Sequence, residues 1–387
     1  MDIEKRLRVV SLDILKGIVM VVMVLDHVRD FFHADAHFFD PCDPELSSPA
    51  IFFTRWITHY CAPVFVLLSG ASIAFIQARK GNAETRRFLL TRGLWLMFCD
   101  TVIVSFLWMF NPAFPMMILG VIWVIGLAMV LSAGVIQWSS RWLMILAAVV
   151  LLGHNALDAS EGIDSSFLYS LLHQFHPTFF GDLKVLVAYP LLPWVGIMWV
   201  GIVLGRMHLN PKPLLNAQLR KAGGLMVLGF FLIRGVNLYG NAFPWMQQAD
   251  FAGTAMDFLN PEKYPPSLAY CLMTLGPALI LLSFLDTRTK WAEYLMVFGR
   301  VPFFFYLVHL LLIHVLAWGL SVIQGFGWDA MILDEFVTRS PKLKGYGLGL
   351  LGVYGVWISA VVALYRPSRF WMNYKKNNPE KWWLSYL

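Results

Sequence analysis

A dense group of ionisable residues closes the first apolar segment of the chain. This segment, SLDILKGIVMVVMVLDHVRDFFHADAHFF, ends in a run of acidic, basic and imidazole side chains: Asp26, His27, Arg29, Asp30, His33, Asp35 and His37. In a helix of 3.6 residues per turn, Asp26, Asp30 and His33 share one face, and His27 neighbours Asp30. A carboxylate beside an imidazole fixes its tautomer and raises its basicity, as a general base requires. We therefore predict that His27 is a catalytic base oriented by Asp26 or Asp30.

A second interpretation of this run is a helix end whose charges simply meet water. We favour that interpretation for Arg29, Asp35 and His37. Asp26 and His27 lie a turn or two deeper, where ionisable groups are costly in an apolar setting and usually line a functional cavity. For these two residues we favour function.

Further polar residues are expected at the same level of the molecule. Each of them, taken alone, is more often a hydrogen-bonded structural residue. Because they converge on one side, they predict a polar, outward-opening pocket that binds substrate. Its predicted members are Arg55 and His59 before Pro63, Arg234, Lys263, Tyr264 and His309, together with His33 from the first segment.

Lys16 lies eleven residues before His27. That separation spans about 16 Å of helix at 1.5 Å per residue. A long anionic ligand would meet Lys16 first and His27 at its far end, which makes Lys16 a candidate for cofactor binding. Snorkelling of Lys16 to lipid phosphate explains its position equally well.

Composition indicates the elements that must position these residues. The 387 residues are 58% hydrophobic and only 14% charged, about half the charged fraction of a soluble domain. Lipid must therefore be the main solvent, and a crossing helix needs about 20 mostly apolar residues. We predict an all-α integral membrane protein, one transmembrane domain over 1–387, with about ten spans. They are 12–33, 54–78, 88–110, 116–136, 141–157, 183–206, 218–239, 266–286, 298–321 and 346–366, with 291–300 as an amphipathic lead-in to the ninth.

The basic residues predict the orientation of these spans. With the N-terminus inside, 21 of the 30 Lys and Arg residues fall in the tails and the loops of one side. This bias follows the positive-inside rule and places both termini in the cytoplasm. It also explains the net charge of +6 without nucleic acid. The segment 367–387, ending in KKNNPEKWWLSYL, is predicted to be a cytoplasmic interfacial tail.

The four cysteines predict neither a metal site nor a disulfide framework. Cys42, Cys61, Cys99 and Cys271 show no CxxC spacing. A Cys42–Cys61 bridge on the outer side is a weak alternative. We expect no metal.

Several segments of the chain carry a family resemblance. They run in order along essentially the whole sequence: RVVSLDILKGIVMVVMVLDHVRDFF, TRWITHYCAPVFVLLSGAS, LLTRGLWL, YPLLPWVGIMWVGIVLG, KYPPSL, FGRVPFFFYLVHLLLIH and WWLSYL. The chain resembles the heparan-alpha-glucosaminide N-acetyltransferase catalytic-domain family, especially its bacterial members. Its first helix is also similar to the wider transmembrane acyltransferases, which carry a basic residue and a His at the spacing of Lys16 and His27, with Lys where Arg is usual.

The resemblance implies a ten-helix bundle with a defined chemistry. Acetyl-CoA, or another acyl-CoA, enters from the cytoplasm, and the acyl group passes to a hydroxyl or amine of a sugar or glycan on the far side. His27 falls where the family places a catalytic polar residue. In the heparan enzyme that position resembles Asn, and its His lies in the following loop, where this chain has His33 and His37. The choice among His27, His33 and His37 stays open, and the heparan substrate is not carried over.

The sequence is compatible with three classes of function. The first is a transmembrane acyltransferase, expected in a bacterial inner membrane, in which Arg55, Arg234 or Tyr264 stabilises the oxyanion. Transfer directly or through an acyl-His27 intermediate, and a monomer or a homodimer, are all compatible with it. The second is a transporter of a small metabolite, although no internal repeat supports it. The third is a non-enzymatic scaffold, which needs no such group of polar residues.

Overall fold

The computed structural model describes residues 9–160, 166–209, 214–285 and 289–386. Lys5, Arg6, Arg8, Lys212 and Arg288, which are among the 21 basic residues of the predicted cytoplasmic side, lie outside these ranges. The described chain is mostly helical. Its α-helices are α2 (Val10–Phe32), α3 (Pro49–Trp56), α4 (Cys61–Phe98), α5 (Ser105–Met109), α6 (Val121–Val135), α7 (Ser140–Gly153), α8 (Phe167–Leu172), α9 (Leu191–Leu209), α10 (Leu215–Val236), α11 (Phe251–Phe258), α12 (Leu268–Leu282), α13 (Lys290–Arg300), α14 (Pro302–Ile323) and α15 (Leu350–Asn377).

Several of these helices have the character of membrane spans. Within the described residues, five helical stretches are long and apolar enough to cross a membrane: Pro49–Met109, Ser140–Asp158, Leu191–Leu209, Pro302–Ile323 and Leu350–Asn377. Each of the ten predicted spans overlaps a helix. However, α6 and α12 are short, and α2 carries ionisable side chains along its length. The amphipathic lead-in predicted at 291–300 is α13.

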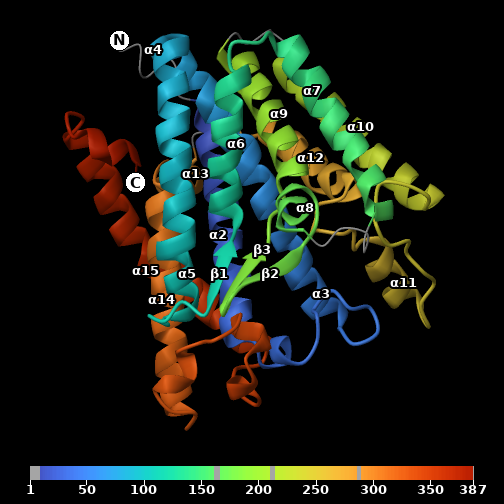
Figure 1. Cartoon of the computed structure of the whole chain (residues 1–387), viewed down its shortest axis with the longest axis vertical. Coiled ribbons are helices and arrows are strands. Elements are labelled where there is room, and N and C mark those ends of the chain that lie inside the picture. Colours follow the sequence, from blue (N-terminus) through green and yellow to red (C-terminus); the bar gives the residue numbers. More distant parts are fainter. Residues whose placement is uncertain (1–8, 161–165, 210–213, 286–288, 387) are drawn as a thin grey trace.

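The prediction of an all-α chain needs one correction. Met116–Leu119 is strand β1, which pairs in parallel with β3 (Leu183–Val187), and β2 (His176–Phe180) pairs antiparallel with β3. The fourth and sixth spans, expected to begin at 116 and 183, therefore begin as helix only at Val121 and Leu191. Short apolar runs do not separate strand from helix by periodicity alone. Figure 1 shows the sheet at the ends of α6 and α9.

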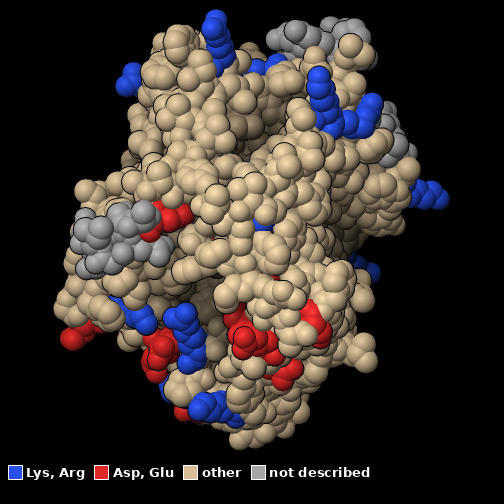
Figure 2. Space-filling view, turned by 90° about the vertical axis from the view of Figure 1, so that its right-hand side faces the viewer, with Lys and Arg blue, Asp and Glu red and all other residues tan. Residues whose placement is uncertain are grey.

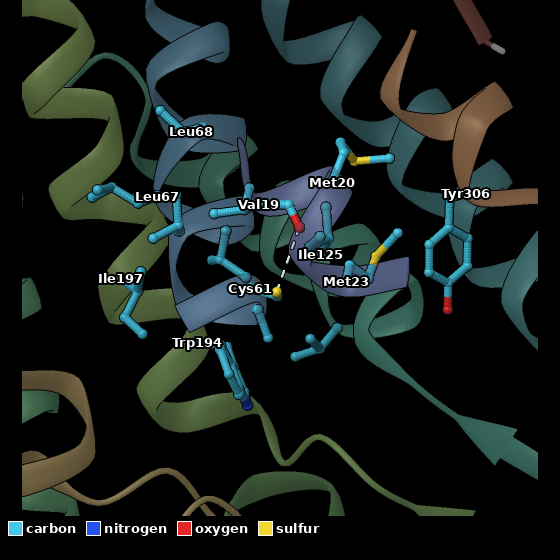
Figure 3. Packing of buried hydrophobic residues seen from close by; sticks show 14 of the residues in the cluster. Val19, Met20, Met23, Cys61, Leu67, Leu68, Ile125, Trp194, Ile197 and Tyr306 are labelled. Carbon is cyan, nitrogen blue, oxygen red and sulfur yellow. Dashed lines mark hydrogen bonds between the residues drawn. The ribbon is translucent and has the colours of Figure 1, made fainter. Parts of the chain in front are cut away.

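Helix α2 occupies the middle of the bundle. It contacts α4, α12, α13, α14 and α15, and Figure 1 shows it behind α4 and α6, with α15 at one edge of the molecule. Its side chains Ile14, Met20 and Val28 are fully buried. Figure 3 shows α2 packed against α4, where the Cys61 thiol donates to the carbonyl of Val19 at 3.4 Å. The helix that carries the candidate base is therefore held by neighbours on every side.

The crossing of α2 and α13 depends on two glycines. A Cβ atom added at Gly17 would lie 2.1 Å from the carbonyl oxygen of Leu295, and one at Gly299 would lie 2.0 Å from that of Asp13. Backbone atoms cannot yield as a flexible side chain does. The close approach fixes the position of α13 along the axis of α2, and therefore the position of Arg300.

We predict that Gly17→Ala lowers stability by at least about 2 kcal/mol, because overpacking forces the two backbones apart. Thermal unfolding of the purified protein measures this loss. Gly134→Ala in α6 is the matched control, since nothing lies within 4 Å of a Cβ there. Equal unfolding temperatures for the two variants would contradict the proposed crossing.

The C-terminal segment folds back onto the bundle. Helix α15 continues to Asn377, and the 3₁₀ turn η8 (Trp382–Tyr386) packs on α4. There Arg92 and the indole of Trp95 donate to the carbonyl of Tyr386. The tail predicted at 367–387 is thus partly a continuation of the last helix.

Candidate functional site

The helical path is interrupted between α3 and α4, next to the predicted site residues Arg55 and His59. The 3₁₀ turn η2 (Ile57–Tyr60) joins the two helices and ends three residues before Pro63, which lacks a backbone N–H. The carbonyl of His59, which that N–H would have bonded in a continuous helix, instead accepts from the Tyr270 hydroxyl at 2.7 Å. The turn places Arg55 and Thr58 against α2.

Asp26 lies at the centre of an ion-pair network. Its carboxylate accepts from Arg55 Nη1 at 2.5 and 2.7 Å and from the Thr58 hydroxyl at 2.9 Å. Arg29 Nη2 lies 3.2 Å from Asp26 and 2.6 Å from Asp30. Both carboxylates are therefore occupied by guanidinium groups. The Asp26 side chain is 13% exposed, so it is largely buried among these partners.

His27 has a different partner from the predicted one. Its Nδ1 lies 2.6 Å from Nε2 of His309 on α14, and Trp108 and Tyr306 flank the ring edge-on. Asp26 and Asp30, the acids predicted to orient His27, both pair with arginines, and the hydrogen bond of His27 goes to His309. His309, predicted as a substrate-binding residue, takes that place. It is fully buried, whereas His27 stays partly exposed.

The hydrogen-bond chain through His309 fixes both tautomers. His309 Nδ1 lies 3.1 Å from the carbonyl of Phe305, which can only accept, so that nitrogen carries the hydrogen. A buried imidazole with no carboxylate bonded to it is neutral, and Nε2 of His309 therefore offers a lone pair. Nδ1 of His27 must then donate to it, which leaves the lone pair of His27 on Nε2. That is the protonation state of a general base.

Lys263 and Tyr264 complete this region from the turn before α12. Both interact electrostatically with Asp26, and the Lys263 Nζ lies 4.9 Å from the centre of the Tyr264 ring. Burial acts to raise the pKa of Tyr264, but the charges of Lys263 and Arg55 outweigh it and lower that pKa. We use "polar cluster" below for Asp26, His27, Arg29, Asp30, Arg55, Thr58, Lys263, Tyr264 and His309.

Other predicted residues lie apart from the polar cluster. Arg234 donates to the carbonyls of Asp257 and Phe258 at 2.6 and 2.9 Å, so it caps the end of α11 rather than facing His27. The His59 ring is buried with Nε2 4.0 Å from the Cys42 thiol. His33 is buried at the end of α2, 3.8 Å from Asp35. His37 packs edge-on against Tyr346.

The cysteines are four buried, free thiols. The weak alternative of a Cys42–Cys61 bridge is wrong, since Cys61 bonds to Val19 and Cys42 lies beside His59. Burial raises the pKa of Cys42 to about 12, so this thiol is not ionised at neutral pH.

We predict that a thiol reagent at pH 8 labels none of the four cysteines in the native protein within minutes. The thiolate is the reactive form, and these thiols are buried and protonated. Unfolding in dodecyl sulfate should expose all four. Mass spectrometry counts the adducts, and rapid labelling of native Cys42 would contradict the packing described here.

Lys16 lines a cleft at the opposite end of α2. The cleft has a volume of about 390 Å³. Its cationic side chains are Lys16, Arg79 and Arg300, and Arg300 also pairs with Asp13 at 3.2 Å. The N-terminus of α14, at Pro302, opens onto the same space. Several basic groups and a helix N-terminus suit a phosphate-bearing ligand.

The cleft and His27 lie along one face of α2. Eleven residues make about three turns plus 20°, so Lys16 and His27 point in nearly the same direction. Met20 and Met23 fill the face between them, and they are 0% and 5% exposed. Figure 3 shows both side chains on the side of α2 that faces Tyr306. Unbranched thioethers change rotamer easily.

Sequence reasoning missed four contributors to these sites. Thr58 follows Arg55 by three residues, and that helical spacing could have found it. Arg79 and Arg300 were counted only as loop charges, and Trp108 carries no polar signal. Among the described residues, no group of three or more His, Cys, Asp and Glu side chains could hold a metal ion.

The fold and the polar cluster together define a mostly helical membrane protein with ionisable groups inside its helices. The chain belongs to the family described as heparan-alpha-glucosaminide N-acetyltransferase, catalytic, which matches residues 8–235. The match begins before α2 and ends in α10. It therefore includes Lys16, Asp26 and His27, and ends before Lys263 and His309. A search of curated proteins gave no significant match. Membership implies a membrane acetyltransferase type of activity.

Proposed function

We propose that this protein transfers an acyl group, in the simplest case acetyl, from cytoplasmic acyl-CoA to a sugar or glycan acceptor on the outer side of the membrane. The observation that carries the proposal is the pair of sites on one face of α2. A basic cleft lies at Lys16, and an imidazole with a defined tautomer lies about 16 Å further along at His27. Family membership supports the reaction type.

The proposed orientation has about ten spans and both termini in the cytoplasm, in an inner membrane of bacterial type. Figure 2 supports it for the face shown. At the end that bears the N-terminus, this face shows Lys and Arg without Asp or Glu, whereas Asp and Glu lie from the middle to the other end, with further Lys and Arg among them. This orientation turns the Lys16 cleft to the cytoplasm and the polar cluster outward.

At the donor end, the phosphates of CoA would contact Lys16, Arg79 and Arg300. The remaining arm of the donor would follow α2 toward His27 once Met20 and Met23 change rotamer. Met side chains accept such rearrangement because they are flexible and form no strong hydrogen bonds.

At the acceptor end, a hydroxyl or amine attacks the thioester carbonyl carbon while Nε2 of His27 takes its proton. Collapse of the tetrahedral adduct breaks the carbon–sulfur bond, and the proton passes from His27 to the departing thiolate. The products are the acylated acceptor and free CoA. Of the candidate oxyanion donors, Arg234 faces α11 and Arg55 is bonded to Asp26. The Tyr264 hydroxyl is therefore the candidate that we retain.

Purified protein in lipid nanodiscs tests the proposal. We expect free thiol to be released from acetyl-CoA in the presence of amino sugars or sugars, with an equal amount of acylated acceptor found by mass spectrometry. Protein with Lys16 and His27 both replaced is the blank. If wild-type protein neither binds acetyl-CoA nor releases thiol with any sugar, the proposed function is wrong.

A further inference from the structure

Lys263 is a buried cation without a carboxylate partner. Its residue is 7% exposed, and among the residues that the structure describes no acidic group forms an ion pair with it. The adjacent Glu262 carboxylate instead accepts from the backbone N–H of Tyr264 at 3.0 Å. The Lys263 ammonium hydrogen-bonds to the Tyr264 side chain and lies 4.9 Å from the centre of its ring.

The polar cluster carries more positive than negative side chains. Within the described part of the chain, the acids that form ion pairs in this cluster are Asp26 and Asp30, and both are engaged by Arg29 and Arg55. Arg29 Nε is also buried without a hydrogen-bond partner. An uncompensated buried charge is costly, so the site is incomplete without a further anion.

The pKa of the Tyr264 hydroxyl reflects the same excess of positive charge. Burial alone would raise its pKa, yet the neighbouring Lys263 and Arg55 lower it. Lys263 also interacts electrostatically with His27. An anion held by Lys263 would therefore lie beside the proposed base.

We infer that the polar cluster binds an anionic group carried by the acceptor, a carboxylate or a phosphate on the sugar, with Lys263 as its principal cation. That the anion belongs to the acceptor rests on the proposed function, whereas the binding of an anion rests on the contacts of the polar cluster. Arg55 is held by Asp26 and positions that acid, whereas the Lys263 ammonium remains available to a ligand. The substrate class is thus an acidic sugar rather than a neutral one.

Binding is tested without turnover, by thermal unfolding of the full-length protein in nanodiscs at constant ionic strength. The probes are glucose, glucuronate and glucose 6-phosphate. We expect one or both anionic sugars to stabilise the wild-type protein and glucose to have no effect. The two anionic arms separate carboxylate from phosphate recognition. In Lys263→Met the affinity should fall roughly 10- to 100-fold, as expected for loss of a charged hydrogen bond.

Two further variants make the result specific. Lys263→Arg keeps the charge and should keep a preference for the anionic sugars, while Lys344→Met removes an exposed lysine and should change nothing. Equal binding of glucose and both anionic sugars to wild-type protein would overturn the inference, as would unchanged anion binding in Lys263→Met. Selective anion binding without thiol release from acetyl-CoA would refute the proposed function and leave the anion site standing.

Discussion

Replacing His27 with alanine should lower kcat for acyl transfer by about 10²- to 10⁴-fold, the usual contribution of a positioned general base. The imidazole of His27 is the partly exposed member of the His27–His309 pair. Its Nδ1 lies 2.6 Å from Nε2 of His309, which leaves its lone pair on Nε2. Thiol release from acetyl-CoA at saturating acceptor measures the effect. The KM for acetyl-CoA should change little, because the proposed phosphate site at Lys16 is about 16 Å away.

Two other histidine variants show whether the loss of activity is specific to His27. His208→Ala in α9 is the matched control, since that ring bonds to the Leu204 carbonyl of its own helix and lies outside the polar cluster. His309→Phe should lower kcat less than His27→Ala, because it removes the group that orients the base but not the base. Its pH–rate profile should also shift, which a purely structural change would not produce. Unchanged turnover in His27→Ala would remove His27 from the mechanism and return attention to His33 and His37.

The double variant Lys16→Met, Arg79→Met should raise the KM for acetyl-CoA by roughly 100-fold or more, because each charge-assisted contact to phosphate is worth about 1.5–3 kcal/mol. The value of kcat should fall much less, since the polar cluster is untouched. In wild-type protein the KM should rise with salt, and this dependence should weaken in the variant. Steady-state kinetics at two ionic strengths measure both effects.

Lys80→Met is the control for the donor cleft. Lys80 follows Arg79 directly and, like Arg79, is exposed, but it does not line the cleft. A KM that is unchanged in the double variant, or raised equally in Lys80→Met, would show that CoA binds elsewhere.

Hydropathy located the helices well because span length and apolar content are local properties. Each predicted span overlaps a helix, and α13 lies where an amphipathic lead-in was expected. The strands were missed because β1 and β3 are short apolar runs joined directly to helices, and their pairing links residues far apart in sequence. The break of α4 at Gly81, with φ of 75°, separates the second and third predicted spans.

The sequence predicts how far along each helix the site residues lie, but not which side chains contact one another. The place of a charged residue near a helix end indicates its position along the helix axis, but not which neighbouring helix its side chain faces. Arg234 has a suitable level and faces α11. His309 lies 282 residues from His27, so only the packing of α14 against α2 could show that these rings meet. Likewise, Arg55 reaches Asp26 through the turn at η2.

Met20 and Met23 also bear on the permeability of the membrane. A protein with a wet recess at each face risks conducting protons down the electrochemical gradient. The two buried thioethers, at 0% and 5% exposure, interrupt any chain of water between the recesses. In the proposed orientation, the same side chains that yield to the donor arm insulate the cell at rest.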